Sequence, residues 1–253
     1  MNKGVDSQGF IINPCDKKNI QDIYAKLVKE SCREIIRKFP EKIHSLYIYG
    51  SVGRGEAVEE KSDLDMVVLF HQGPSTLKKN DLKDLSKLLI DKHPIVPKVD
   101  FDIGSVEEVM AEGQKLFWQF FLKHCCSCIY GTDITLNFSR VKPTKELSER
   151  LNHGFESKID SILEHTTPDN IAEQGKALGK QILRSAYLLT IEQNQSYYND
   201  IPSCVTALLK CHPSLKNEID IALDLIENKN TSMIKINKLV KTLGRWVIEN
   251  TSY

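Results

Sequence analysis

The sequence lacks an excess of charge of either sign. Its 34 Lys and Arg residues are matched by 34 Asp and Glu residues, and the balance also holds within residues 1–140 and within residues 141–253. A protein that binds extended nucleic acid mainly through its phosphates carries a basic excess. The composition therefore disfavours extended nucleic acid as a partner.

Long apolar runs are missing too. No stretch approaches the ~20 apolar residues that cross a bilayer, and the opening residues, Met1 to Asp6, lack the apolar core of a secretory signal. The seven cysteines are odd in number and scattered, which favours reduced thiols over a disulfide framework. We expect a cytoplasmic protein with no membrane partner. The sequence leaves its oligomeric state open.

What is present divides the chain in two. A length of 253 residues suits one or two domains. In residues 1–140, apolar patterning predicts strands that alternate with helices, which indicates an α/β or α+β domain. The expected strands are 44–49, 63–70, 98–103 and 126–130, and the expected helices are 17–38, 82–94 and 105–123.

Residues 141–253 show helical spacing and no β-rich run, so we expect a separate helical bundle. The predicted helices are 145–164, 169–194, 200–211, 215–228 and 231–250. No low-complexity linker separates this part from the first, which suggests that the two pack closely.

A glycine-rich turn follows the first expected strand. Gly50 and Ser51 end this strand and precede a short helix, so backbone N–H groups and a hydroxyl point to one place, as in phosphate sites. Gly53 and Gly55 keep Cβ atoms away from a close ligand. Taken alone, the pattern also fits an ordinary turn.

Two acids follow the turn. Asp63 and Asp65 stand two residues apart at the start of an apolar strand, so both carboxylates project from one face. Neighbouring carboxylates repel each other unless a cation lies between them. Mg²⁺ commonly shares such acids with substrate phosphates. A charged strand edge is the alternative, but the turn ahead of the pair favours metal–triphosphate chemistry.

The pattern of Gly50-Ser51, Arg54-Gly55 and Ser62-Asp63-Leu64-Asp65 resembles the DNA polymerase β-type nucleotidyltransferase superfamily. Within it, the small bacterial members, the minimal and aminoglycoside nucleotidyltransferases, are most similar. The motif match spans residues 46–70 and extends to about residue 103 with the third strand. The resemblance implies an α+β fold: a small mixed β-sheet with flanking helices in residues 1–140, followed by an all-helical bundle in residues 141–253.

The resemblance also implies a third carboxylate on a neighbouring strand. Asp100 and Asp102 both lie on the polar face of the third expected strand, and Asp100, nearer its middle, is favoured, with Asp102 as the alternative. Asp63, Asp65 and Asp100 would then be the catalytic acids and would hold two Mg²⁺ ions. Asp100 would also accept the proton of the acceptor hydroxyl.

For the nucleotide, the resemblance implies that Gly50, Ser51 and Arg54 bind the phosphates, although Arg54 has the alternative of pairing only with a nearby glutamate. In the second domain, Lys180 and Arg184 are four residues apart and share a helix face. They are candidates for a phosphate clamp, with a solvated basic face as the alternative.

These expectations add up to a Mg²⁺-dependent nucleotidyltransferase. It would transfer a nucleoside monophosphate from a nucleoside triphosphate, with ATP as the expected nucleotide, to a hydroxyl group of a small molecule between the two domains. One alternative is transfer to a protein or a tRNA end, as in toxin-type relatives. A second alternative is a nucleotide-binding regulator without catalysis.

Overall fold

The computed structural model describes residues 3–73 and 76–251. It divides into two compact units, Ile12–Val141 and Lys142–Tyr253, the latter joined by Met1–Ile11. We call them the sheet unit and the helical unit. The division lies next to the predicted one at residues 140 and 141, but the N-terminal segment groups with the helices. One reason is a hydrogen bond of 2.9 Å from the Tyr197 N–H to the Lys3 carbonyl.

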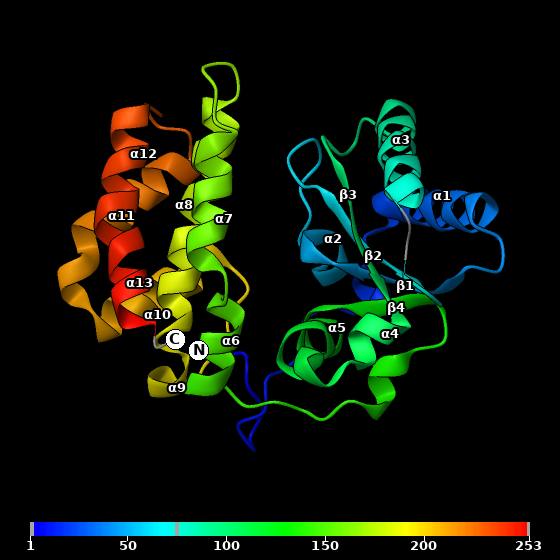
Figure 1. The fold of residues 1–253 in the computed structure, drawn as a ribbon, viewed down its shortest axis with the longest axis horizontal. Helices are drawn as coiled ribbons and strands as arrows, with labels where there is room; N and C mark the ends of the chain where they lie inside the picture. The colour runs from blue at the N-terminus through cyan, green and yellow to red at the C-terminus, as the bar shows by residue number, and fades with distance from the viewer. Residues whose placement is uncertain (1–2, 74–75, 252–253) are drawn as a thin grey trace. The chain divides into compact units, whose positions relative to one another are not determined.

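The sheet unit alternates strands and helices (Figure 1). Its strands are β1 (Ile43–Tyr49), β2 (Leu64–Phe70), β3 (Val99–Ser105) and β4 (Ser127–Gly131). Its α-helices are α1 (Asp22–Lys38), α2 (Gly50–Arg54), α3 (Thr76–Lys92), α4 (Val106–Met110) and α5 (Phe120–Cys125). Shorter turns are the 3₁₀ segments Lys17–Asn19, Glu112–Gln114 and Ile134–Asn137 and the π-helical segment Lys115–Gln119.

The four strands form one mixed sheet in the order β3-β2-β1-β4. β1 pairs antiparallel with β2 and with β4, whereas β2 and β3 run parallel. Because the chain passes through α3 between β2 and β3, the parallel pair has the crossover connection that parallel strands need. The expected small mixed sheet is confirmed.

Alternating side chains give the sheet two apolar faces. Leu46 and Ile48 of β1 join the larger core, to which α1 and α3 contribute. Tyr47 of β1 and Val67 of β2 point to the opposite face and join a smaller core with α4 and α5. The strand period of two residues explains this division. Odd-numbered residues of β1 and β2 therefore share the face of the smaller core.

The helical unit has no strand among its described residues, apart from an isolated bridge between Val5 and Ile11. Its helices are α6 (Lys145–Asn152), α7 (Phe155–Glu164), α8 (Ile171–Leu188), α9 (Ile191–Asn194), α10 (Ile201–Cys211), α11 (Lys216–Ile226), α12 (Met233–Leu239) and α13 (Arg245–Asn250). A 3₁₀ turn, Pro213–Leu215, precedes α11, and a π-helical segment, Val240–Gly244, joins α12 to α13.

Helix α8 is the centre of this bundle. Its buried residues run from Gly175 to Tyr187, and it packs against the neighbouring helices α7, α10 and α11 (Figure 1). Gly179 lets α11 approach closely, because a Cβ atom at this position would lie 2.9 Å from the Ala222 carbonyl oxygen. None of the helices within the described ranges is long and apolar enough to cross a membrane.

Several predicted helices are interrupted. The helix expected at 145–164 is two, α6 and α7, because Gly154 takes a left-handed conformation with φ of 71° between them. The helix expected at 105–123 ends early: Ala111 is extended, with ψ of 137°, and 3₁₀ and π-helical turns follow before α5. The helix expected at 169–194 pauses between α8 and α9. Apolar spacing located the helical regions but not these breaks.

Candidate active site

The glycine-rich turn connects β1 directly to α2. Gly50 has φ of 69°, a left-handed conformation that favours glycine. A Cβ atom at this position would lie 2.0 Å from Oδ2 of Asp65. Gly50 therefore does two things: it turns the chain sharply after the strand, and it leaves room for a carboxylate against the turn.

Arg54 ends α2, and its side chain is largely covered by the protein. Its Nε donates a hydrogen bond of 2.8 Å to Oε2 of Glu56. Gly55 follows in a left-handed conformation, and its N–H donates to the carbonyl of Val52. The ion pair that the sequence allowed for Arg54 is thus present, on the same short turn that carries the half-buried Ser51.

The predicted acids meet on one face of the sheet. Asp65 lies opposite Tyr49 of β1 and opposite Asp100 of β3. Asp102 follows two residues later on β3, opposite Val67. Since side chains alternate along a strand, Asp65, Asp100 and Asp102 share the face of the smaller core. Asp63 immediately precedes β2.

The charges of these acids act on one another. Burial, followed in order by the charges of Asp63, Asp100 and Asp102, raises the pKa of Asp65 to about 7, while Lys98 opposes them. Asp65 thus has three carboxylates near enough to disfavour its ionised form. A divalent cation among them would reverse this effect.

Asp100 and Asp102 have polar partners in the sheet unit. Nζ of Lys98 lies 2.9 Å from Oδ2 of Asp100. The hydroxyl of Tyr49 donates a hydrogen bond of 2.7 Å to Oδ2 of Asp102. As they stand, no three His, Cys, Asp or Glu side chains within residues 3–73 and 76–251 are arranged to hold a metal ion.

The donor set nevertheless fits Mg²⁺. It consists of carboxylate oxygens, the ligands that Mg²⁺ takes in proteins, and it leaves positions that phosphates can fill. Burial and the repulsion of the neighbouring acids both raise the pKa of Asp65, and a bound cation would offset this cost of ionising it. Asp100 would have to turn from Lys98 to join Asp63 and Asp65.

Aromatic side chains stand beside the acids. The rings of Tyr49 and of Phe121 in α5 form a T-shaped pair, with their centroids 5.0 Å apart. Trp118 of the π-helical segment covers Gly104, where a Cβ atom would lie 3.0 Å from the indole ring. Short π-helical segments such as the one that carries Trp118 often occur at functional sites. Beyond the acids, β3 is therefore covered at Gly104 by the indole ring of Trp118.

Sequence reasoning missed Tyr49, Lys98 and Trp118 as neighbours of the acids. The sequence shows which residues of each strand share a face of the sheet, but it does not show the register between neighbouring strands. That register places Tyr49 opposite Asp65 and brings its hydroxyl to Asp102.

Comparison with known proteins places this geometry in a family. Residues 30–119 match the model of the family described as polymerase beta, nucleotidyltransferase. The matched range contains the turn of Gly50 to Arg54 and all four acids. This part of the chain is a polymerase β-type nucleotidyltransferase domain.

The wider fold also has a solved counterpart. A spectinomycin adenyltransferase from Enterococcus faecialis, solved with ATP and spectinomycin, is similar in fold with a TM-score of 0.53. The two chains are 17% identical, and the similarity covers 87% of this chain and 98% of that one. None of the curated proteins compared with the chain matches it. Together, the family match over residues 30–119 and this similar fold support a nucleotidyltransferase that resembles the aminoglycoside nucleotidyltransferases.

Outside the nucleotidyltransferase domain, Lys180 and Arg184 lie on α8. Lys180 is half-buried and Arg184 is exposed. Nη2 of Arg184 donates a hydrogen bond of 3.4 Å to the Asn199 carbonyl. The helix places the two cations one turn apart, as their spacing predicted.

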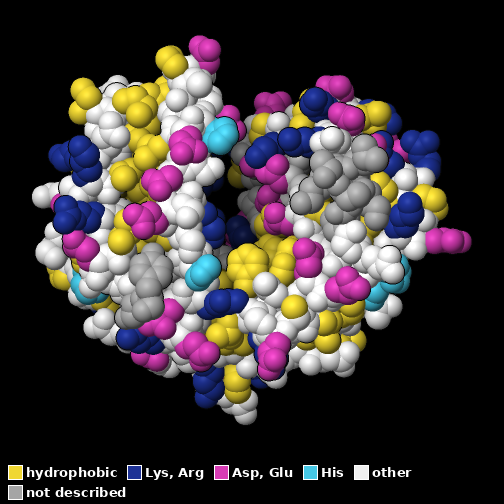
Figure 2. All heavy atoms as spheres, viewed as in Figure 1, with side chains coloured by type: hydrophobic (Ala, Val, Ile, Leu, Met, Phe, Trp, Pro, Cys, Tyr) yellow, Lys and Arg dark blue, Asp and Glu magenta, His cyan; other side chains and the backbone are white. Residues whose placement is uncertain are grey.

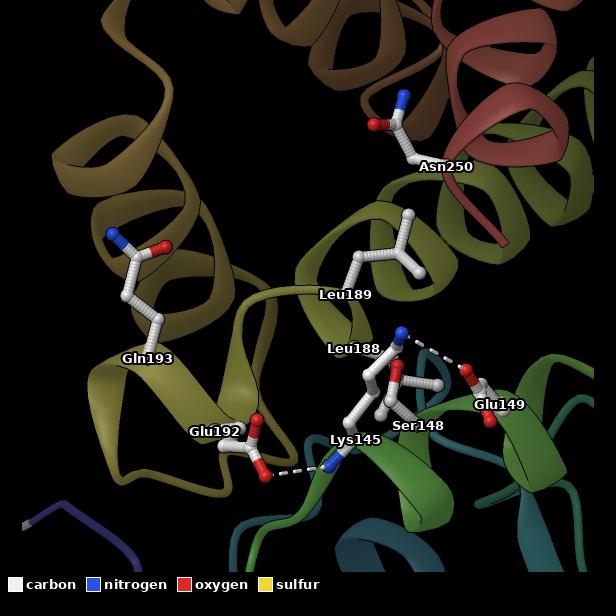
Figure 3. A pocket seen from close by; sticks show the side chains of 8 residues that line it. All are labelled: Lys145, Ser148, Glu149, Leu188, Leu189, Glu192, Gln193 and Asn250. Atoms are coloured by element: carbon white, nitrogen blue, oxygen red, sulfur yellow. Dashed lines mark hydrogen bonds and ion pairs between the residues drawn. The ribbon is translucent and has the colours of Figure 1, made fainter. Parts of the chain in front are cut away.

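A hollow of about 150 Å³ lies within the helical unit (Figure 3). Lys145 lies at one side, where its Nζ is 3.6 Å from Oε1 of Glu149 and its backbone N–H donates to Glu192 (Figure 3). Neither Lys180 nor Arg184 lines this hollow. On the face drawn in Figure 2, basic and acidic side chains are interspersed over both units.

Gly50→Ala tests the fit of Asp65 against the turn. We expect pyrophosphate release to fall by about 100-fold or more, because the added methyl group displaces the Asp65 carboxylate, and even ångström-scale misplacement costs that much. The measurement is steady-state pyrophosphate release, with circular dichroism to confirm folding.

Gly73→Ala is the matched control, because a Cβ atom there meets nothing within 4 Å. Its activity should equal that of the unmodified protein. A Gly50→Ala protein with normal activity would contradict the close fit of Asp65 against the turn.

Proposed function

We propose that this nucleotidyltransferase transfers a nucleoside monophosphate from ATP to a hydroxyl group of a small molecule, with Mg²⁺. The observation that carries the proposal is the position of Asp65: it lies against the Gly50 turn and beside the charges of Asp63 and Asp100. A turn that can take phosphates and acids that can take Mg²⁺ thus stand side by side. The similar adenyltransferase, solved with ATP, supports the choice of nucleotide.

The turn would bind the triphosphate. Gly50 and Ser51 provide backbone N–H groups and a hydroxyl for the β- and γ-phosphates, and Arg54 offsets their charge. The bond between Arg54 and Glu56 holds the guanidinium in this region before the nucleotide arrives.

Asp63, Asp65 and Asp100 would hold Mg²⁺. The family resemblance implies that two Mg²⁺ ions are bound. When bound, Mg²⁺ neutralises phosphate charge and stabilises the leaving group. The acids themselves contribute their position at the ends of two paired strands. The sheet register sets Asp65 and Asp100 opposite each other, so both carboxylates can face the same nucleotide.

Asp100 would accept the proton of the acceptor. The hydroxyl oxygen of the acceptor forms a bond to the α-phosphorus, the bond from that phosphorus to its bridging oxygen breaks, and pyrophosphate leaves. The proton of the hydroxyl passes to the Asp100 carboxylate. Asp100 is favoured over Asp102 because it lies directly opposite Asp65 and its charge acts more strongly on Asp65.

The acceptor would be a small hydroxylated compound, similar in kind to an aminoglycoside. The similar adenyltransferase was solved with spectinomycin, and the net charge of zero gives this chain no basic surplus for a polymer such as tRNA. The structure shows no disulfide within residues 3–73 and 76–251, which suits a reducing compartment, and we place the reaction in the cytoplasm.

The direct test of the acceptor is incubation with α-labelled ATP and separate pools of small hydroxylated metabolites with aminoglycosides, tRNA, and cell protein. We expect label in the small-molecule pool. Label found only in tRNA or protein would contradict the small acceptor and support the toxin-type alternative. Nucleotide binding without label in any pool would support a regulator without catalysis.

Metal dependence is the next prediction. ATP should bind at least tenfold more weakly after chelation of Mg²⁺, since the four carboxylates otherwise repel its phosphates by more than the ~1.4 kcal/mol that corresponds to this factor. Calorimetry with ATP and GTP, each with and without Mg²⁺, measures this. Equal affinity in both conditions would refute the metal assignment.

The metal assignment also predicts that Asp63→Asn and Asp65→Asn each abolish pyrophosphate release, while circular dichroism shows an intact fold. If both variants fail to fold, the ATP-binding measurement with and without Mg²⁺ still tests the metal assignment, because it uses the unmodified protein.

The third acid is tested by comparing two neighbours on β3. Asp100→Asn should lower turnover by roughly 10²- to 10⁴-fold, the usual effect of losing a general base, while retaining much of the ATP affinity. Asp102→Asn should lose far less turnover. The reverse order would assign the proton acceptor to Asp102.

The clamp on α8 has its own test. We propose that Lys180 and Arg184 contact the triphosphate, and neutralising both should weaken ATP binding by roughly 1–3 kcal/mol, as for charge-assisted hydrogen bonds. Unchanged affinity in the double variant would make this face a solvated surface.

A further inference from the structure

Tyr49 stands between the phosphate turn and the acids. It is the last residue of β1, it precedes Gly50, and its Cα pairs with that of Asp65 across the antiparallel ladder. No sequence motif singled it out. Its position alone makes it a candidate to influence the acids around it.

The side chain of Tyr49 reaches across the sheet to Asp102. β2 lies between β1, which carries Tyr49, and β3, which carries Asp102. The hydroxyl of Tyr49 nevertheless donates a hydrogen bond of 2.7 Å to Oδ2 of Asp102. The rings of Tyr49 and Phe121 form a T-shaped pair with their centroids 5.0 Å apart, and this contact helps to fix the direction of the hydroxyl. A long, braced side chain thus holds a carboxylate two strands away.

This bond concerns an acid that the ligand set does not need. Asp102 shares its sheet face with Asp65 and Asp100 and lies two residues beyond Asp100 on β3. Its side chain is exposed, so nothing but its hydrogen bonds limits its rotation. Released, the carboxylate can turn toward the other acids and bind a cation in competition with them.

We propose that Tyr49 is a positioning residue that holds Asp102 out of the metal ligand set, so that Asp63, Asp65 and Asp100 bind Mg²⁺ in the productive arrangement. This inference rests on the proposed function. It assigns Asp102 a fixed hydrogen-bonded position. It also explains how Asp102 can lie near the three acids that bind Mg²⁺ without joining them.

Removing only the hydroxyl separates this role from packing. Tyr49→Phe keeps the ring and its contact with Phe121 and deletes the bond to Asp102. We expect turnover to fall roughly 10- to 100-fold, the scale of a misplaced catalytic group, with little change in the KM for ATP. Nucleotide-free Tyr49→Phe should bind Mn²⁺ severalfold more tightly, because a fourth carboxylate becomes available.

The decisive variant is the double one. Adding Asp102→Asn to Tyr49→Phe removes the competing charge, so turnover should rise to the level of Asp102→Asn alone, and the gain in Mn²⁺ affinity should disappear. A purely structural role for Tyr49 predicts that the two substitutions add instead. Titration calorimetry with MnCl₂ and pyrophosphate release measure the two effects on all four proteins.

Tyr47→Phe is the matched control. Tyr47 lies two residues earlier on the same face of β1, is buried, and accepts a hydrogen bond from the Ile134 N–H through its hydroxyl. Its variant should lose stability while keeping Mn²⁺ affinity and turnover.

Three outcomes would overturn the inference: unchanged turnover and Mn²⁺ affinity in Tyr49→Phe, additive losses in the double variant, or an equal effect of Tyr47→Phe. Failure of the proposed function looks different. In that case the unmodified protein labels no acceptor, while the Mn²⁺ titration still reports whether Tyr49 controls Asp102.

Discussion

Repulsion among carboxylates is the constraint on which the candidate active site depends. Asp65 lies beside three other acids, and burial together with their charges raises its pKa to about 7. The sheet forces this proximity, because the register of β2 and β3 sets Asp65 opposite Asp100. Lys98 and Tyr49 offset part of it by engaging Asp100 and Asp102. Folding therefore brings together negative charges that a bound cation can stabilise.

The turn and the acids depend on each other. Gly50 is required both by its left-handed backbone and by the Asp65 carboxylate, which occupies the space of a Cβ atom. The phosphate-binding end of the site and its metal-binding end are thus coupled through one glycine. A substitution in the turn would disturb the acids, although no acid is changed.

Much of this could be predicted from sequence. The period of two residues in the strands gave the faces of Asp65 and Asp100, and the glycines located the turn. The mixed sheet followed from the family resemblance and is confirmed. The pairing of β1 with β2 and of β2 with β3, however, is a long-range property that no local pattern contains, so the approach of Tyr49 to Asp102 could not be predicted. The break at Gly154 was missed because apolar spacing continues through it.

Anomalous diffraction from crystals of the protein with Mn²⁺ and a non-hydrolysable ATP analogue tests the central claim most directly. The account predicts manganese bound by Asp63, Asp65 and Asp100, triphosphate oxygens on the turn from Gly50 to Arg54, and Asp102 still bonded to Tyr49. Bound nucleotide with no manganese at these acids, or with its phosphates away from the turn, would contradict it.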